Sequence, residues 1–408
     1  MSKLDIEFVR AQFPAFKEPT LQGQAFFENA GGSYTSKFVI DRLHCYYSQR
    51  KVQPYAPYGA SKIAGEEMDE GRTRLAGVLN IPTNDLSFGP STTQNIYVLA
   101  QAFRQILKAG DAIIVTNQDH EANSGPWRKL ADSGILVREW AVDKDTGFLD
   151  VADLANLLDD KVKLVAFPHV SNIVGQINPV AEICAIVKAA GAVTCVDGVS
   201  FAPHGLPDIK ALGADIYLFS AYKTYGPHQG IMYVDAYLAK RLPNQAHHFN
   251  AGSPYKRFTP AGPDHAQIAA SAGMVDYIEA VHDHHFDADE SLAEKARAML
   301  KLQQAHEAEL MAPLLEYLRA RNDVRLIGAD KVGERVSTVA IGLKRAAEEV
   351  ARDLAKHGIM AGGGDFYAGR LIERLGINPE HGVLRLSFVH YTTAQEVEQL
   401  MKALDQTL

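Results

Sequence analysis

The chain has 408 residues, of which 47% are hydrophobic and 22% are charged, and its formal net charge is −8. This length and composition predict a globular protein with a large core and two or three domains. The acidic balance and the lack of a Lys/Arg block argue against nucleic-acid or anionic-membrane binding. The N-terminus has no apolar core of a signal peptide, and no stretch approaches the about 18 apolar residues of a membrane span. Three widely spaced cysteines fit a cytoplasmic protein without a disulfide framework.

Four short apolar runs between residues 90 and 235 are typical of buried strands. They are DAIIVTNQ (111–118), VKLVAFPH (162–169), AVTCVDGV (192–199) and DIYLFSA (215–221). Between the second and the third run, residues 178–191 predict a helix, with Asn178 as N-cap, Pro179 in the first turn and Gly191 at the end. This alternation of strand and helix predicts a mostly parallel sheet with helices on both faces.

The composition changes after the fourth run. Residues 237–266 are rich in Gly, Pro and His and predict a long loop that serves a site or an interface. Beyond them a charged helical stretch extends from about 289 to 320. Two further strand-like runs and two helices follow, at 337–343, 346–357, 383–388 and 393–406. They predict a second, smaller α+β domain.

Unusual polar residues follow or end the four predicted strands. His120 follows the first strand, Asn172 follows the second, Asp197 lies inside the third and Lys223 follows the fourth. Ligands of such sheets bind at the carboxyl ends of the strands. An amine at the end of a core strand is costly to desolvate, but a desolvated lysine is a good nucleophile. Asp197 has apolar neighbours, so its carboxylate must be paired or its pKa rises.

The sequence also contains a candidate anion site. Ser91, Thr92 and Thr93 precede a helical apolar stripe over residues 96–103, and hydroxyls with free amides at a helix N-terminus bind phosphate. Alone, this pattern would indicate an ordinary Ser/Thr cap. Together with the strand-end residues it describes a ligand with a phosphate, an aldehyde, a cationic ring nitrogen and a flat face. Pyridoxal 5′-phosphate has all four.

In this interpretation Lys223 forms the Schiff base and Asp197 keeps the pyridine nitrogen protonated. Arg385, in the predicted strand VLRLSF, offers its bidentate fork to the α-carboxylate of a substrate.

Seven segments carry a resemblance to a known family: FFENAGGS (26–33), STTQNI (91–96), DHEAN (119–123), HVSNIVGQINP (169–179), VDG (196–198), SAYKTYGP (220–227) and TPAGPDHAQIA (259–269). The sequence resembles fold-type I pyridoxal-phosphate enzymes, specifically class V aminotransferases of the cysteine desulfurase group. The resemblance implies a large cofactor-binding domain over residues 21–288 with a seven-stranded type of sheet. It further implies a small domain over 289–408, with the N-terminal segment 1–20 packed on the small domain.

The resemblance also implies site roles. His120 would stack on the cofactor ring, Asn172 would reach the ring hydroxyl or the substrate carboxylate, and Lys223 would act as base. The other implied contacts are Ser220 and Tyr222 at the phosphate, Ser200 in place of a glutamine at the ring hydroxyl, Ala30 and Gly31 in the substrate loop, and His265 at the phosphate of the partner subunit in a homodimer. Tyr222 stands where the family has a histidine.

The sequence departs from the family where a mobile cysteine should attack the substrate sulfur. Residues 358–377 contain no cysteine; Tyr367 stands about where the thiol belongs, and Gly362 where an arginine is frequent.

The resemblance implies an enzyme that acts on an α-amino acid through an external aldimine and a Cα carbanion. We expect a lyase that cleaves C–S or C–Se bonds by β-elimination without a persulfide. A class V aminotransferase, an epimerase and a non-catalytic pyridoxal-phosphate sensor or partner protein remain alternatives.

Two other motifs predict structure rather than chemistry. The histidine-rich run VHDHHFD (281–287) lacks the spacing of zinc ligands and predicts a solvated helix end, with no metal site. The glycine run AGGG (361–364) lacks the context of a dinucleotide fingerprint and predicts a hinge or lid.

Overall fold

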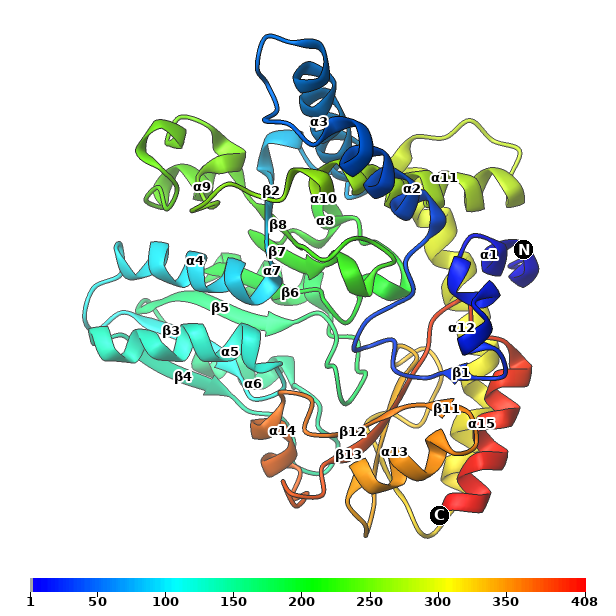
Figure 1. Ribbon diagram of the computed structural model, residues 1–408. Helices are drawn as coiled ribbons and strands as arrows, with labels where there is room; N and C mark the ends of the chain where they lie inside the picture. The colour runs from blue at the N-terminus through cyan, green and yellow to red at the C-terminus, as the bar shows by residue number, and fades with distance from the viewer. Residues whose placement is uncertain (1–2) are drawn as a thin grey trace.

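Seven strands form the central sheet in the computed structural model, which describes residues 3–408 (Figure 1). Their order across the sheet is β2-β8-β7-β6-β5-β3-β4. The strands are β2 (Leu86–Gly89), β3 (Ala112–Thr116), β4 (Leu136–Trp140), β5 (Val162–Pro168), β6 (Val193–Asp197), β7 (Ile216–Ser220) and β8 (Gly230–Val234). Strand β8 is antiparallel to both of its neighbours, and the other pairs are parallel. The mostly parallel sheet predicted from the sequence is confirmed.

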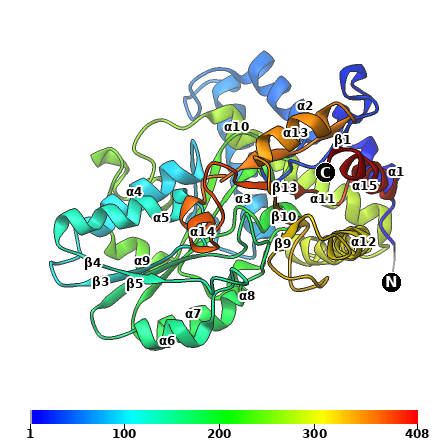
Figure 2. The same cartoon turned by 90° about the horizontal axis from the view of Figure 1, so that it is seen from below.

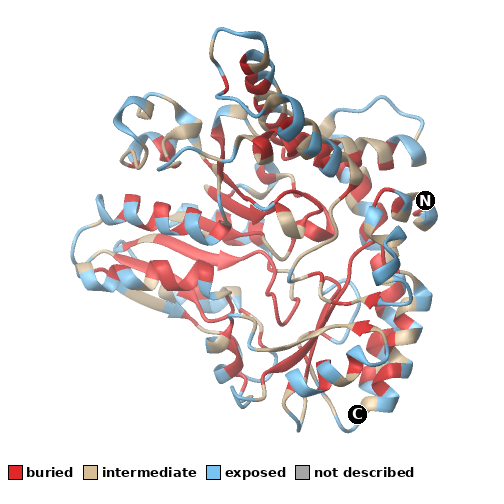
Figure 3. Ribbon diagram, in the orientation of Figure 1, coloured by how far each residue is buried: buried red, intermediate tan, exposed pale blue. Residues whose placement is uncertain are grey.

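Each of the four predicted strands contains one observed strand, β3, β5, β6 or β7. All five residues of β3 and of β7 are buried, as expected for strands covered on both faces. Figure 3 shows the sheet buried and the outer faces of the surrounding helices exposed.

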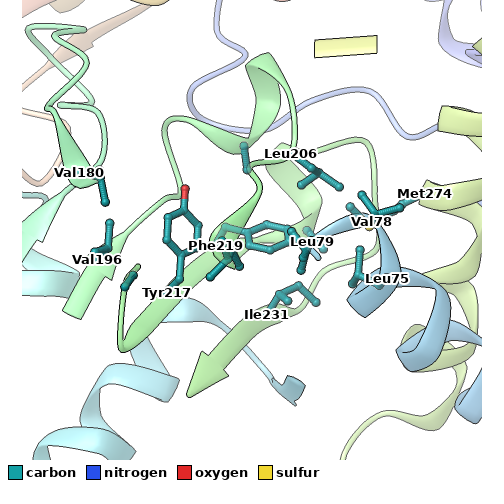
Figure 4. Packing of buried hydrophobic residues seen from close by; sticks show 14 of the residues in the cluster. Leu75, Val78, Leu79, Val180, Val196, Leu206, Tyr217, Phe219, Ile231 and Met274 are labelled. Atoms are coloured by element: carbon teal, nitrogen blue, oxygen red, sulfur yellow. The ribbon is translucent and has the colours of Figure 1, made fainter. Parts of the chain in front are cut away.

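Helices cover both faces of the sheet. Seen from below, α4 and α5 lie on one side of β3, β4 and β5, and α6, α7 and α8 lie on the other (Figure 2). The helices of this part are α2 (Lys37–Cys45), α3 (Gly59–Val78), α4 (Thr92–Arg104), α5 (Glu121–Arg128), α6 (Val151–Leu157), α7 (Val180–Ala189), α8 (Ile209–Leu212), α9 (Ala236–Arg241), α10 (His265–Ala270) and α11 (Ala272–His285). Figure 4 shows one of the two core layers, where Val180 of α7 packs near Val196 of β6, beside Tyr217 and Phe219 of β7.

The start of α7 differs from the prediction. The helix begins at Val180, its N-cap is Pro179, and Asn178 lies outside it. The side-chain amide of Asn178 instead donates to the Pro168 carbonyl and to Gln118 Oε1, both at 2.8 Å. A tertiary contact has therefore taken the side chain that the sequence pattern assigned to the cap.

A smaller unit follows the sheet. It contains α12 (Leu292–Arg319), β9 (Arg325–Ile327), β10 (Thr338–Gly342), α13 (Ala347–Ala355), β11 (Ile359–Met360), β12 (Gly362–Gly364), α14 (Gly369–Arg374), β13 (Val383–Ser387) and α15 (Ala394–Thr407). Its antiparallel sheet has the order β12-β13-β10-β9. Short 3-10 or π turns connect the elements: η1 (Pro14–Lys17), η2 (Pro19–Leu21), η3 (Tyr46–Arg50), η4 (Thr83–Asp85), η5 (Lys129–Ser133), η6 (Ala202–His204), η7 (Ala221–Lys223), η8 (His248–Asn250) and η9 (Pro254–Lys256).

The glycine run 361–364 is not the predicted hinge or lid. Gly362, Gly363 and Gly364 form β12 and pair with β13, with Gly362 opposite Arg385. A Cβ on Gly363 would lie 2.2 Å from the backbone carbon of Ala347, so the missing side chain lets α13 approach the strand.

The predicted solvated helix end at residues 281–287 is only partly exposed. His282, near the end of α11, is fully buried, and its ring nitrogens bond Asp283 and Glu290 at 2.9 and 3.1 Å. In the part of the chain that the structure describes, no group of three or more His, Cys, Asp or Glu residues is arranged to hold a metal ion. None of the helices within residues 3–408 is both long enough and apolar enough to cross a membrane.

The N-terminal segment connects both parts of the fold. Its helix α1 (Ile6–Ala11) is bound to α15 through the ion pair of Arg10 with Glu396 at 3.0 Å. Asp5 meets His284 of α11 at 2.9 Å. Strand β1 (Ala25–Phe26) then pairs in parallel with β11. The domain boundaries at residues 20 and 288 stay predictions.

Candidate active site

Four neighbouring strands bring the predicted residues to one edge of the sheet. Lys223 follows β7, Asp197 ends β6, Asn172 follows β5 and His120 follows β3, and these strands are consecutive in the sheet. An inner cavity opens there, as expected at the carboxyl ends of parallel strands. Its polar wall consists of Thr92, Thr93, His120, Asn172, Asp197, Ser200, Ser220, Tyr222 and Lys223.

The N-terminus of α4 forms one end of this cavity. Ser91 is the N-cap, and its hydroxyl accepts from the Gln94 N–H at 3.1 Å. The buried hydroxyls of Thr92 and Ser220 share a hydrogen bond of 2.9 Å, which joins α4 to β7. A Cβ on Gly230 of β8 would lie 2.4 Å from the backbone carbon of Ser91, so this glycine lets the helix start at the sheet. Free amides and two hydroxyls here suit a phosphate.

Lys223 projects into the cavity as a reactive amine. Burial and then the charge of Arg385 lower the pKa of Lys223 to about 8, against the opposing charges of Asp197 and Glu28. Within residues 3–408 no side chain forms a hydrogen bond or an ion pair with its Nζ atom. A larger share of the amine is therefore unprotonated near neutral pH than for an exposed lysine.

Asp197 is the acid of the inner cavity. Its side chain is buried, and the Val199 N–H donates to Oδ1 at 2.8 Å. Burial raises the pKa of Asp197 to about 6, although the Val199 N–H and the Lys223 charge oppose the rise. The group is mostly a carboxylate at neutral pH, so it can accept a hydrogen bond from a protonated ring nitrogen.

His120 presents a neutral imidazole to the same cavity. It is the N-cap of α5, and its Nδ1 accepts from the Ala122 N–H at 3.0 Å. Burial, followed by the charges of Lys223 and Arg385, lowers the pKa of His120 to about 4. An uncharged flat ring is suited to stacking on an aromatic ligand.

Asp119, next to His120, was missed by the sequence reasoning. The Thr116 hydroxyl donates to its Oδ2 at 2.8 Å, and the Asn123 amide donates to its Oδ1 at 3.0 Å. Burial and then the charge of Asp197 raise the pKa of Asp119 to about 8, against the opposing hydrogen bonds from Asn123 and Thr116. The residue anchors the turn that carries His120; its place inside DHEAN was the only available signal.

A larger outer cavity of about 640 Å³ adjoins the inner one. The two share Thr93, His120, Ala122, Asn172, Tyr222 and Lys223, and the outer wall adds Glu28, Ala30, Gly31, Tyr97, Glu121, Lys129, Phe366, Tyr367 and Arg385. This volume lies within the range typical of small-molecule sites. All four residues expected at the substrate, Ala30, Gly31, Asn172 and Arg385, line it.

The guanidinium of Arg385 already has hydrogen-bond partners within the protein. Its Nη2 donates to Glu28 Oε1 at 2.6 Å, and its Nη1 donates to the Asn172 carbonyl at 3.3 Å. The Phe366 ring covers one face of the guanidinium, 3.8 Å from its carbon. Sequence reasoning missed Glu28, whose only signal is its position just before Ala30 in FFENAGGS.

A loop of the small unit closes the outer cavity beside Asn172. The Asn172 side-chain amide donates to the Phe366 carbonyl at 3.0 Å, while its Oδ1 is buried without a partner in the described chain. Tyr367 is exposed, and its ring centroid lies 5.2 Å from that of His120. Both Phe366 and Tyr367 have positive φ angles, 49° and 59°, which is strained backbone for side chains of this size.

Two predicted cofactor residues line neither cavity of their own chain. Ser91 caps α4 without reaching the inner wall. His265 begins α10 and lines a separate cavity together with Tyr55 and His247. Burial lowers the pKa of His265. The cross-subunit role of His265 stays a prediction.

Comparisons with known proteins show the family and the fold. Residues 25–400 match the family model described as aminotransferase class-V. An aminotransferase-like protein of Gibberella zeae is 33% identical over 100% of this chain and 99% of its own length. A cysteine desulfurase of Yersinia pseudotuberculosis is 30% identical over 98% of each chain. The apo structure of a cysteine desulfurase from Thermococcus onnurineus has a TM-score of 0.86 and 25% identity, and covers 100% of this chain and 98% of that one.

Proposed function

Because the chain belongs to the class V aminotransferase family, we propose that it is a pyridoxal-phosphate enzyme acting on an α-amino acid. One observation carries the proposal. The desolvated amine of Lys223, which has no hydrogen-bonding side-chain partner within residues 3–408, and the buried carboxylate of Asp197 lie at the ends of adjacent parallel strands on one cavity. This pair supplies an amine for an aldehyde and an anion for a protonated ring nitrogen.

The residues of the inner cavity fit this cofactor. The start of α4 with Thr92, Thr93, Ser220 and Tyr222 would hold the phosphate. His120 would stack on the ring, and the partnerless Asn172 Oδ1 and the Ser200 hydroxyl suit the ring hydroxyl. When bound, pyridoxal phosphate serves as an electron sink for charge that develops at the substrate Cα.

Lys223 would then act as the base. With a pKa of about 8, a larger share of its amine is unprotonated near neutral pH than for an exposed lysine, and only the unprotonated amine can accept a proton. The neutral imidazole of His120 would stack on the cofactor ring without adding charge to the site. Asp197 stays ionised and would therefore stabilise a positive charge on the ring nitrogen of the cofactor.

We propose β-elimination as the reaction. Lys223 takes the Cα proton, the bond from Cβ to sulfur or selenium breaks, and the leaving group departs with the bonding electrons. Hydrolysis of the remaining fragment gives a 2-keto acid and ammonia. The cysteines support a reaction without persulfide: within residues 3–408 none of the three lines either cavity, and burial raises the pKa of Cys184 to about 11.

Transamination and epimerisation begin with the same proton transfer to Lys223 and are the alternatives within this enzyme class. A non-catalytic sensor that binds the cofactor and an amino acid is the alternative of another class. Product assays separate these reactions. Elimination from L-cysteine or L-selenocysteine releases pyruvate with sulfide or selenide, transamination releases a keto acid without either, and epimerisation changes only chirality. A sensor changes its cofactor spectrum without forming product.

The cofactor proposal has its own test. Purified protein incubated with pyridoxal phosphate should gain a visible absorption band, and reduction with borohydride should fix the cofactor to the peptide that contains Lys223. Lys223→Ala should show neither result. The matched control is Lys188→Ala, which alters an exposed lysine of α7. A wild-type protein that stays colourless and unlabelled contradicts the proposal.

We also propose a homodimer in which His265 reaches the phosphate of the partner subunit. Two inactive variants test this arrangement, Lys223→Ala and His265→Ala. If each site uses Lys223 from one chain and His265 from the other, mixed dimers contain one intact site and regain activity. Sedimentation as a monomer, or mixtures that stay inactive although each variant dimerises, would argue against the shared site.

A further inference from the structure

The carboxylate-binding arginine of the outer cavity already holds a carboxylate of its own chain. Arg385 and Glu28 form an ion pair of 2.6 Å, in which the Arg385 side chain is 4% exposed and the Glu28 side chain 27% exposed. A substrate carboxylate that approaches Arg385 therefore meets a negative charge at the position it would take.

The ion pair uses only part of the bonding capacity of each group. One N–H of Arg385 reaches one oxygen of Glu28, while Arg385 Nε and Glu28 Oε2 are buried and lack a partner anywhere in residues 3–408. A carboxylate that engages two N–H groups of a guanidinium forms a stronger, bidentate contact. A better-oriented carboxylate can therefore replace that of Glu28.

The backbone around Glu28 leaves room for its carboxylate. A Cβ on Gly31 would lie 2.9 Å from Glu28 Oε1, and a Cβ on Gly362 would lie 2.9 Å from Oε2. Glu28 also lines the outer cavity of about 640 Å³, which gives its side chain space to rotate away from Arg385. The Phe366 ring covers one face of the guanidinium, and Glu28 lies at its edge, where a carboxylate binds with two hydrogen bonds.

We propose that Glu28 is a specificity-determining residue that competes with the substrate carboxylate for Arg385. With Glu28 paired, the cavity presents a neutralised arginine and accepts amines that lack a carboxylate. A ligand with a carboxylate binds only after it displaces Glu28 into the outer cavity. The inference deepens the proposed function, since it rests on Arg385 being the carboxylate site of that enzyme.

The test uses the cofactor-loaded enzyme and two ligands that share a phenylethyl group. One is 3-phenylpropionate, which has a carboxylate and no amine, and its binding is measured by calorimetry. The other is 2-phenylethylamine, which has an amine and no carboxylate, and its binding is measured from the cofactor absorption. Glu28→Gln keeps the size of the side chain and removes its charge. Glu348→Gln is the control, because it removes the same charge from an exposed ion pair with Arg352, outside both cavities.

Breaking a charge-assisted hydrogen bond corresponds to about a ten- to hundredfold change in a binding constant. Glu28→Gln should therefore bind 3-phenylpropionate at least about tenfold more tightly than the wild type does, with less than about a twofold change for 2-phenylethylamine. Glu348→Gln should match the wild type with both ligands. Glu28→Asp retains the charge but shortens its reach to Arg385, and should also bind the carboxylate more tightly.

An unchanged or weaker affinity of Glu28→Gln for 3-phenylpropionate, with cofactor absorption and melting intact, overturns the proposal, because Glu28 then positions Arg385 rather than competing for it. If Glu28→Gln does not fold, the comparison of Glu28→Asp with the wild type decides the question in the same way. Failure of the proposed function itself has a different signature, the absence of cofactor absorption in the wild-type protein.

Discussion

Replacing the lysine that carries the proposed chemistry should stabilise the apoprotein. An ordinary lysine has a pKa near 10.4, whereas burial and Arg385 lower the pKa of Lys223 to about 8. Between these two values the unfolded chain is protonated and the native chain is not, so stability rises with pH. Below the folded pKa the full cost applies, because the amine is then protonated in both states and folding must desolvate its charge.

The drop in the Lys223 pKa to about 8 amounts to about 3 kcal/mol near pH 7 and under about 1 kcal/mol near pH 10. These are upper values, since Lys223 is not completely buried and water in the cavity screens part of its charge. Lys223→Met should therefore raise the free energy of unfolding by up to about 3 kcal/mol near pH 7, and this advantage over the wild type should shrink as the pH approaches about 10.

Urea unfolding of cofactor-free protein at several pH values measures this difference. The control is Lys188→Met, at an exposed position of α7, which should show no such trend. If Lys223→Met is no more stable than the wild type near neutral pH, or if its advantage is the same at every pH, the Lys223 amine is not desolvated as described.

Three further predictions follow from the site. Turnover should fall as the pH drops through about 6, where Asp197 gains a proton, and Asp197→Asn should lower kcat by about a hundredfold or more and remove this pH dependence. Gly230→Ala should lower the free energy of unfolding by about 1–3 kcal/mol in urea, because its Cβ would lie 2.4 Å from Ser91 backbone, and should weaken cofactor retention on dialysis. Replacing all three cysteines by alanine should leave kcat within about threefold, since none of them lines a cavity within residues 3–408; a large loss would restore a thiol mechanism.

The inner cavity could be predicted because it depends on local sequence and on one general rule. Each of Lys223, Asp197, Asn172 and His120 lies at or just after the end of an apolar run. The carboxyl ends of parallel strands meet at one edge, so the order of the runs was sufficient to bring these residues together. Their roles toward a cofactor remain proposals.

The outer cavity could not be predicted in the same way. Glu28 and Arg385 are 357 positions apart, and neither sequence pattern contains a sign of the other. The misassigned cap at Asn178 has a similar cause, because its partner Gln118 is 60 positions away. The run 361–364 was misread for a different reason: glycines that permit flexibility also permit close packing, and only the neighbouring helix decides between the two.

The two sides of the site come from different parts of the fold. Lys223, Asp197 and the start of α4 lie at one edge of the central sheet, whose strands fix their positions. The Arg385 side is built by the small unit and the N-terminal segment, where Glu28 forms a parallel bridge with Ser387, two residues beyond Arg385 on β13. Residues two apart on a strand share a face, so this bridge brings Glu28 beside the guanidinium. Under the proposed function, a change at Glu28 or its glycine neighbours would therefore alter carboxylate recognition and leave the position of Lys223 unchanged.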